Sequence, residues 1–193
     1  MGFSLRYALP LMPIDLTPKL LTLQAIAFDV DGVLTDGTLT WNAADPASES
    51  KTFSFADIMG VSLARRLGLH LALISGEPST LVDRYAAKLH IRHVTKGCRD
   101  KATALREFSA TTGVELDDIC FFGDDVNDLF AMEIAGLSAC PADASEDVRA
   151  HVSAQGFVST KPGGCGAVRD LIDHILRSRN LRGQDVFLLR QRG

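Results

Sequence analysis

The sequence predicts an α/β fold built on a doubly wound, mostly parallel sheet. Apolar runs alternate with helical patterns from about residue 24 to residue 176, which is typical of parallel strands covered by helices on both faces. Acidic residues directly follow two of these runs, at the strand ends where an open parallel sheet forms its ligand crevice. One stretch, about residues 38–55, breaks the alternation and predicts an inserted β-hairpin.

Each expected strand is a short apolar run, and helical patterns lie between these runs. The hairpin is expected to pair Thr38–Trp41 with Lys51–Phe55 around the turn-rich stretch Asn42–Ser50. Strands of the main sheet are expected at Ala25–Phe28, Leu69–Ile74, His93–Val94, Ile119–Phe122, Leu137–Ala139 and Phe157–Val158. Helices are expected near Ile58–Leu67, Ser79–Leu89, Lys101–Thr112, Asp125–Ala135, Ser145–His151 and Ala167–Leu176.

Length and composition indicate one soluble globular domain over residues 1–193, long enough to bury roughly 70% of its extended-chain surface. Apolar residues make up 46% and charged residues 23%, which excludes disordered and fibrous classes. The net charge of -4 offers no basic excess for a nucleic-acid partner. The first residues, Met1–Met12, form a poor signal peptide and are too short to span a bilayer, so no membrane partner is expected.

The four cysteines are expected to be reduced thiols, because no two lie at the short spacing of a zinc or redox motif. Two of them lie in apolar surroundings and are expected in the core, which fits a cytoplasmic location. The cysteines are Cys98, Cys120, Cys140 and Cys165, and the two core positions are Cys120 and Cys140.

Asp29 ends the first expected strand, and Asp31 follows two residues later where the backbone turns. One carboxylate of such a pair can attack a phosphate ester and become an aspartyl-phosphate, while the other protonates the leaving alkoxide and then activates water. An isolated Asp-x-Asp is more often an acidic turn or a helix cap, so the pair alone only suggests a two-step hydrolysis.

The second acidic cluster, Gly123-Asp124-Asp125, strengthens the catalytic interpretation. Oxygen ligands suit Mg²⁺, and Asp29 and Asp124 with one backbone carbonyl would suffice to hold it. Asp128 lies one helical turn beyond Asp124 and is expected either to support a ligand from behind, with Asp125 in the same cluster, or simply to stabilise a helix N-terminus.

Further groups that suit a phosphate follow other strands. Ser75 and Gly76 come after Leu69–Ile74 and offer a hydroxyl and free backbone N–H groups, although an ordinary turn looks the same. Lys101 opens a helix and would neutralise charge on the nucleophile and the phosphoryl group, although most lysines are merely solvated.

Taken in order, Asp29-x-Asp31, Ser75, Lys101 and Gly123-Asp124-Asp125-x-x-Asp128 resemble the four motifs of the haloacid dehalogenase superfamily of phosphatases. The stretch Asp29–Gly37, the hairpin and the segment Gly163–Asp170 make the chain similar to one branch, the 3-deoxy-D-manno-octulosonate 8-phosphate phosphatase family.

The resemblance implies a Rossmann-like core, a hairpin in place of a cap domain, a homotetramer, and hydrolysis of a sugar phosphate such as 3-deoxy-D-manno-octulosonate 8-phosphate. It further implies that Asp29 is the nucleophile and Asp31 the general acid and base. Mg²⁺ would bind Asp29, the backbone carbonyl of Asp31, and Asp124, while Ser75 and Lys101 would hold the phosphate.

Substrate selection is expected where the chain departs from the family pattern. The family carries a basic residue, Asp and Gly after the hairpin, whereas this chain has Ala56-Asp57-Ile58-Met59-Gly60. The segment usually written Gly-Gly-Arg-Gly has Cys165 in the Arg position. Asp57 and Arg169 are the expected substrate-selecting residues in these two places.

Two other functions share this residue set. A phosphomutase uses the same nucleophile but usually needs a cap that excludes water, and the stretch between Asp31 and Ser75 leaves room only for a hairpin. A non-catalytic phospho-receiver domain has an acidic pair, a phospho-accepting Asp, a hydroxyl and a Lys, but in a different order along the chain.

The C-terminal tail, about residues 177–193, combines several arginines with the apolar patch Val186–Leu189. We expect the arginines to be solvated. The alternative is that the tail docks onto a neighbouring subunit with the apolar patch as its anchor. The arginines are Arg177, Arg179, Arg182, Arg190 and Arg192.

Overall fold

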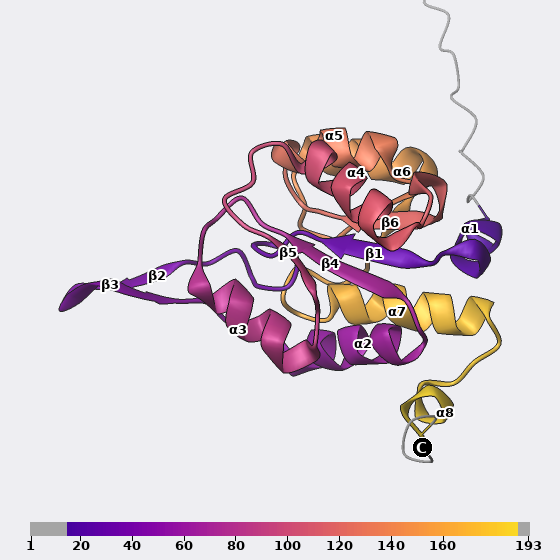
Figure 1. Cartoon of the computed structure of the whole chain (residues 1–193), viewed down its shortest axis with the longest axis horizontal. Coiled ribbons are helices and arrows are strands. Elements are labelled where there is room, and N and C mark those ends of the chain that lie inside the picture. The colour runs from indigo at the N-terminus through magenta and orange to yellow at the C-terminus, as the bar shows by residue number, and fades with distance from the viewer. Residues whose placement is uncertain (1–14, 189–193) are drawn as a thin grey trace, which may run out of the picture.

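A six-stranded parallel sheet forms the centre of the computed structural model, which describes residues 15–188 (Figure 1). The strand order is β5-β4-β1-β6-β7-β8, and every neighbouring pair is parallel. This architecture confirms the predicted α/β fold. The strands are β1 Ala25–Phe28, β4 His70–Ile74, β5 His93–Thr95, β6 Ile119–Phe122, β7 Leu137–Cys140 and β8 Phe157–Val158.

Helices cover both faces of the sheet, with α2, α3 and α7 on one side and α4, α5 and α6 on the other (Figure 1). Alternate side chains of β1 pack on opposite faces of the sheet: Ile26 and Phe28 belong to one buried cluster, and Ala25 and Ala27 belong to the other. These helices are α2 Phe55–Arg66, α3 Thr80–Leu89, α4 Lys101–Thr112, α5 Leu129–Ile134, α6 Glu146–Gln155 and α7 Ala167–Ser178.

Helix boundaries follow the capping residues. Ser54 caps α2 by accepting a hydrogen bond from the backbone N–H of Ala56, so this helix begins earlier than expected. The expected helix Asp125–Ala135 is divided into a short 3-10 turn and α5. The short elements, none of them expected as helices on their own, are α1 Thr17–Thr22, η1 Leu116–Asp118, η2 Val126–Asp128 and α8 Gly183–Leu188.

The hairpin is present, but its second strand was wrongly predicted. It pairs β2 Thr40–Asn42 with β3 Asp45–Ser50, so the stretch expected to be the turn is mostly strand. The turn is shorter than expected: the side-chain oxygen of Asn42 accepts a hydrogen bond from the backbone N–H of Ala44 and closes a tight turn between the two strands. Cross-strand pairing with β2 here outweighs the low strand propensity of Asp, Ser and Glu.

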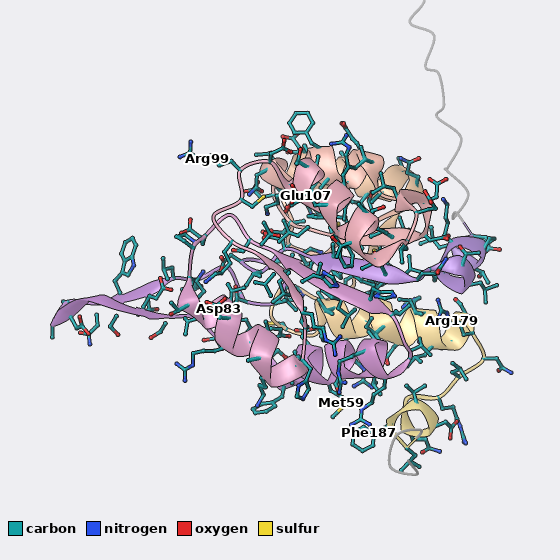
Figure 2. All side chains as sticks on the ribbon, viewed as in Figure 1. Met59, Asp83, Arg99, Glu107, Arg179 and Phe187 are labelled. Atoms are coloured by element: carbon teal, nitrogen blue, oxygen red, sulfur yellow. The ribbon has the colours of Figure 1, made fainter. Side chains whose placement is uncertain are left out.

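The tail packs against its own chain rather than only facing solvent (Figure 2). Val186 is completely buried in the core of its own subunit, so it is not free to anchor a neighbouring subunit, which the alternative interpretation of the tail required. Arg179 donates hydrogen bonds to the backbone carbonyls of Leu20 and Leu23, which corrects its expected solvated state. Leu189, Arg190 and Arg192 lie outside the described residues.

The four cysteines are free, and Cys120 and Cys140 are buried as predicted. Over residues 15–188 no helix is long and apolar enough to cross a membrane. The expectation for Met1–Met12 lies outside the described residues.

Candidate active site

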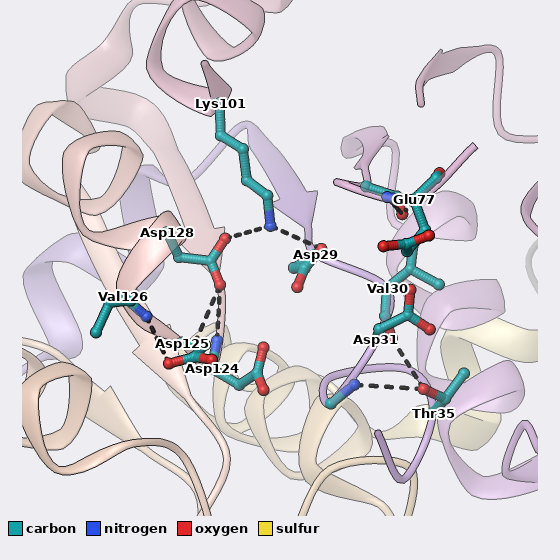
Figure 3. A network of polar contacts seen from close by, with 12 residues as sticks. Asp29, Val30, Asp31, Thr35, Glu77, Lys101, Asp124, Asp125, Val126 and Asp128 are labelled. Carbon is teal, nitrogen blue, oxygen red and sulfur yellow. Dashed lines mark hydrogen bonds and ion pairs between the residues drawn. The ribbon is translucent and has the colours of Figure 1, made fainter. Parts of the chain in front are cut away.

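The order of the strands brings the predicted site residues together. Strands β4, β1 and β6 are neighbours, and Ser75, Asp29 and Gly123 directly follow their carboxyl ends. Because all three strands run in the same direction, these ends meet at one edge of the sheet. Figure 3 shows Asp29, Asp124, Asp128 and Lys101 grouped at this edge.

Lys101 is the buried cation of the site. Its Nζ atom lies 2.9 Å from a carboxylate oxygen of Asp29 and 2.7 Å from one of Asp128, and its side chain is almost fully buried. Burial disfavours the charged ammonium, but the two carboxylates outweigh this effect and raise the Lys101 pKa. The lysine therefore stays charged beside the expected nucleophile.

Asp128 orders the loop that follows β6. Its second carboxylate oxygen accepts hydrogen bonds from the backbone N–H groups of Asp124, at 3.0 Å, and Asp125, at 3.3 Å. A Cβ atom at position 123 would lie 2.5 Å from the Asp128 side chain, so only Gly123 permits this contact. Asp128 thus supports the loop from behind, which is one of the two roles considered for it, while Asp125 is exposed and caps the following turn.

Asp29, Asp124 and Asp128 offer carboxylate oxygens that all lie within 4.8 Å of one another. Burial raises the Asp29 pKa to about 6, with the charge of Asp128 adding to it, and raises the Asp124 pKa to about 8, with the charge of Asp29 adding to it. Carboxylates crowded in this way suit a hard divalent cation, which favours their charged forms.

Both oxygens of Asp128 are already engaged by N–H donors, whereas Asp29 and Asp124 retain free positions for a metal. The loop glycine Gly32 is needed here, because it has a φ of +83° and a Cβ would lie 2.0 Å from Asp124. The donor set therefore fits the predicted Mg²⁺ ligands.

Asp31 lies to one side of this group (Figure 3) and pairs with Lys51, whose Nζ atom is 2.7 Å away. No role of Lys51 in the site was predicted from the sequence. The available signal was the alternation of Glu49, Lys51 and Phe53, which places their side chains on one face of an extended segment. Thr35 was also missed: its hydroxyl donates to the carbonyl of Val30 and accepts from backbone N–H groups of the same loop.

Ser75 is fully buried at the end of β4. Its hydroxyl accepts a hydrogen bond from the backbone N–H of Glu77 at 3.1 Å and so shapes the turn through Gly76. A Cβ built on Gly76 would lie 3.8 Å from the Asn127 amide, which places this turn beside the loop after β6. The position is consistent with a phosphate-binding turn.

Asp57 and Arg169, the expected substrate-selecting residues, both have polar partners within this subunit. Asp57 is completely buried and accepts hydrogen bonds from the backbone N–H groups of Gly166, at 2.9 Å, and Arg169, at 3.0 Å. The Arg169 side chain pairs with Asp173 at 2.8 Å and lines a pocket between α2 and α8. Within this subunit Asp57 therefore positions the start of α7, and the substrate-selecting role of Asp57 and Arg169 stays a prediction.

The segment that Asp57 holds does reach the catalytic loop. The backbone N–H of Gly164 donates to the carbonyl of Val33, and that of Gly163 donates to the Asp143 carboxylate. Gly163 and Gly164, just before Cys165, therefore border the loop that carries Asp31. Cys165, which replaces the Arg of the family pattern, is itself exposed.

Comparison with known proteins agrees with this geometry. A model of haloacid dehalogenase-like hydrolases matches residues 84–163, a stretch that includes Lys101 and Asp124. The chain is 34% identical over 161 residues to the 3-deoxy-D-manno-octulosonate 8-phosphate phosphatase KdsC of Haemophilus influenzae, covering 83% of this chain and 87% of the relative.

Two solved structures extend the comparison. A 3-deoxy-D-manno-octulosonate 8-phosphate phosphatase from Moraxella catarrhalis, in complex with a magnesium ion, a phosphate ion and KDO, is 35% identical with a TM-score of 0.81, and the match covers 90% of this chain and 95% of that one. A putative haloacid dehalogenase superfamily hydrolase from Legionella pneumophila is 30% identical with a TM-score of 0.85, and the match covers 92% of this chain and 94% of that one.

The parallel sheet, the hairpin insertion and the acidic groups at the ends of β1 and β6 define a haloacid dehalogenase-type phosphatase, a phosphoric monoester hydrolase. The chain belongs, within that superfamily, to the 3-deoxy-D-manno-octulosonate 8-phosphate phosphatase family. This membership excludes the non-catalytic receiver domain.

Proposed function

We propose that this enzyme hydrolyses 3-deoxy-D-manno-octulosonate 8-phosphate, or a closely related acid-sugar phosphate, with Mg²⁺ and through an aspartyl-phosphate on Asp29. The observation that carries the proposal is the position of Asp29. Its carboxylate lies at the end of β1, 2.9 Å from the Lys101 ammonium and within 4.8 Å of the Asp124 and Asp128 carboxylates. The Moraxella relative, which binds magnesium, phosphate and KDO, supports the choice of metal and substrate.

The reaction has two steps. A carboxylate oxygen of Asp29 attacks phosphorus, the bond to the sugar oxygen breaks, and Asp31 gives a proton to the departing alcohol. Asp31 then takes a proton from water, whose oxygen attacks phosphorus, and the bond between phosphorus and Asp29 breaks to release phosphate. Lys101 and the turn Ser75-Gly76 hold the phosphoryl oxygens throughout.

Mg²⁺ would bind Asp29, Asp124 and the backbone carbonyl of Asp31, and would neutralise charge on the phosphoryl group. The Asp128 carboxylate keeps Lys101 and the Asp124 loop in place while these ligands bind.

We further propose that the enzyme is a cytoplasmic homotetramer in which the hairpins pack together. The hairpin projects from the body of the subunit (Figure 1). Trp41 on its first strand is 71% exposed, and Leu39 just before that strand is 37% exposed. Exposed apolar side chains of this kind support packing against another subunit. A neighbouring subunit would then contribute to substrate selection, which is consistent with the buried position of Asp57.

Replacing the nucleophile tests the chemistry. Asp29→Asn is nearly isosteric and should reduce phosphate release at least ~10⁴-fold, because an amide cannot form the aspartyl-phosphate. Circular dichroism and thermal unfolding should show an intact fold. An Asp29→Asn variant with substantial activity would refute the assigned nucleophile.

A panel of phosphate esters tests the substrate. Acid sugars of eight and nine carbons should give higher kcat/KM than neutral hexose phosphates, with free phosphate as product and no bisphosphate activator required. Isomerised sugar phosphate in place of free phosphate would instead identify a phosphomutase.

A further inference from the structure

The ion pair between Lys51 and Asp31 is not explained by the roles assigned so far. The Lys51 ammonium lies 2.7 Å from both carboxylate oxygens of Asp31. The lysine side chain is only 3% exposed, whereas that of Asp31 is 30% exposed. A nearly buried ammonium that contacts both oxygens limits rotation of the carboxylate while leaving one side of it open.

We propose that Lys51 is a positioning residue that holds the Asp31 carboxylate as an oriented acceptor for the water that hydrolyses the phosphorylated enzyme. The proposal rests on the function proposed above, in which Asp31 takes a proton from that water. In this step the water oxygen forms a bond to phosphorus, the bond from phosphorus to Asp29 breaks, and the proton passes to Asp31.

The backbone around Lys51 is anchored on both sides, and this fixes the lysine. Glu49 accepts a hydrogen bond from the hydroxyl of Ser79 at the start of α3. The Phe53 ring stacks on the Tyr85 ring of α3 with centroids 4.5 Å apart. Residues 49, 51 and 53 alternate along an extended segment, so all three side chains face the body of the subunit.

A second anchor connects the same segment to the catalytic loop. Phe53 forms an isolated antiparallel bridge with Thr35, whose hydroxyl accepts hydrogen bonds from two backbone N–H groups of the loop after Asp31. The segment Lys51–Phe53 after the hairpin is therefore joined to the loop carrying Asp31 by the backbone bridge as well as by the ion pair. This connection gives Lys51 a defined position relative to Asp31.

Placement of the base determines which kinetic constant responds. The ratio kcat/KM includes steps up to departure of the sugar, while kcat also includes hydrolysis of the aspartyl-phosphate. The Lys51–Asp31 ion pair matches the charged carboxylate that takes the proton from water, whereas Asp31 is neutral when it protonates the departing sugar. Loss of Lys51 should therefore slow mainly the hydrolysis, which lowers kcat and KM together and leaves kcat/KM nearly unchanged. A residue needed only for folding or for substrate binding does not produce this pattern.

The test is Lys51→Met, which keeps much of the side chain's length and removes the ammonium. In single-turnover experiments with acid quenching and ³²P-labelled substrate, the decay rate of the phosphoenzyme should be at least about tenfold lower than in the unsubstituted enzyme. In the steady state kcat and KM should fall in parallel, with kcat/KM within about threefold. Lys51→Arg, which restores the donor, should recover most of the decay rate.

Lys96→Met is the matched control, because it breaks another Lys–Asp pair, with Asp83, in the same region but at a more exposed position. This variant should hydrolyse the phosphoenzyme at the unsubstituted rate. Circular dichroism of each variant checks the fold.

Asp31→Asn separates failure of this inference from failure of the proposed function. If Asp31→Asn slows phosphoenzyme decay and Lys51→Met does not, the positioning role of Lys51 is wrong while the proposed function stands. If Asp31→Asn leaves both formation and decay unchanged, the proposed role of Asp31 is wrong and the inference fails with it. A loss of kcat/KM in Lys51→Met that matches its loss of kcat would also overturn the inference.

Discussion

Asp57 and Asp128 are both completely buried, and their partners determine what each carboxylate does. Asp128 joins Lys101 to the backbone of the loop after β6 and so takes part in the arrangement of the active site. Asp57 instead accepts hydrogen bonds from backbone N–H groups at the start of α7. Burial raises the Asp57 pKa, and these N–H donors oppose the rise.

Asp57→Ala should therefore reduce stability, since it leaves the buried N–H groups of Gly166 and Arg169 without their acceptor. The expected loss is about 2–4 kcal/mol in the free energy of unfolding. Urea denaturation would measure it, and Asp57→Asn should lose less because its amide oxygen still accepts one bond. An Asp57→Ala enzyme of unchanged stability with a raised KM would contradict this structural role and support direct substrate contact by Asp57.

At the scale of elements, the main sheet was predictable and the hairpin was only partly so. Buried parallel strands such as β1 and β6 are continuous apolar runs, and their bounds were predicted correctly at both ends. Strand β3 has polar residues, and its pairing with β2 depends on the turn between them rather than on its own composition. Local pattern therefore located the insertion but not its register.

The exposed Trp41 on the hairpin allows a test of the proposed assembly. Trp41→Ser should weaken the proposed tetramer, because the loss of a large interface aromatic typically costs about 2 kcal/mol or more. Size-exclusion chromatography with light scattering would show a shift to smaller species at low protein concentration. Phe130→Ser is the matched control, because Phe130 is also 71% exposed but lies on α5. Equal masses for both variants and the unsubstituted enzyme would count against hairpin packing.

At the scale of the whole molecule, the carboxylates crowded at one edge of the sheet link stability to pH and metal. Asp29 and Asp124 have pKa values of about 6 and about 8, above the ordinary 3.8. At pH values between 3.8 and about 8 the folded chain therefore binds more protons at these groups than the unfolded chain does. Stability contributed by these groups is therefore greatest at low pH and is lost as pH rises toward 8.

The metal-free enzyme, prepared with chelator, should accordingly show this decline in its unfolding temperature after subtraction of the curve for Asp124→Asn. Mg²⁺ should raise the unfolding temperature more at about pH 8 than at about pH 5, since fewer protons compete for Asp29 and Asp124 at the higher pH. Differential scanning calorimetry would measure both effects. Equal stabilisation by Mg²⁺ at the two pH values would contradict a site built from these carboxylates.

The sequence by itself determined the class of fold and the edge of the sheet that carries the chemistry. Parallel strands end at a common edge, so acids placed directly after two apolar runs, such as Asp29 and Asp124, must approach one another. The tertiary structure decided which partners these residues have: Lys51 lies beside Asp31, Asp57 lies at the start of α7, and Val186 lies in the core of its own subunit. These contacts join residues far apart in the chain, and the periodicity of a local segment contains no information about which distant segment packs against it.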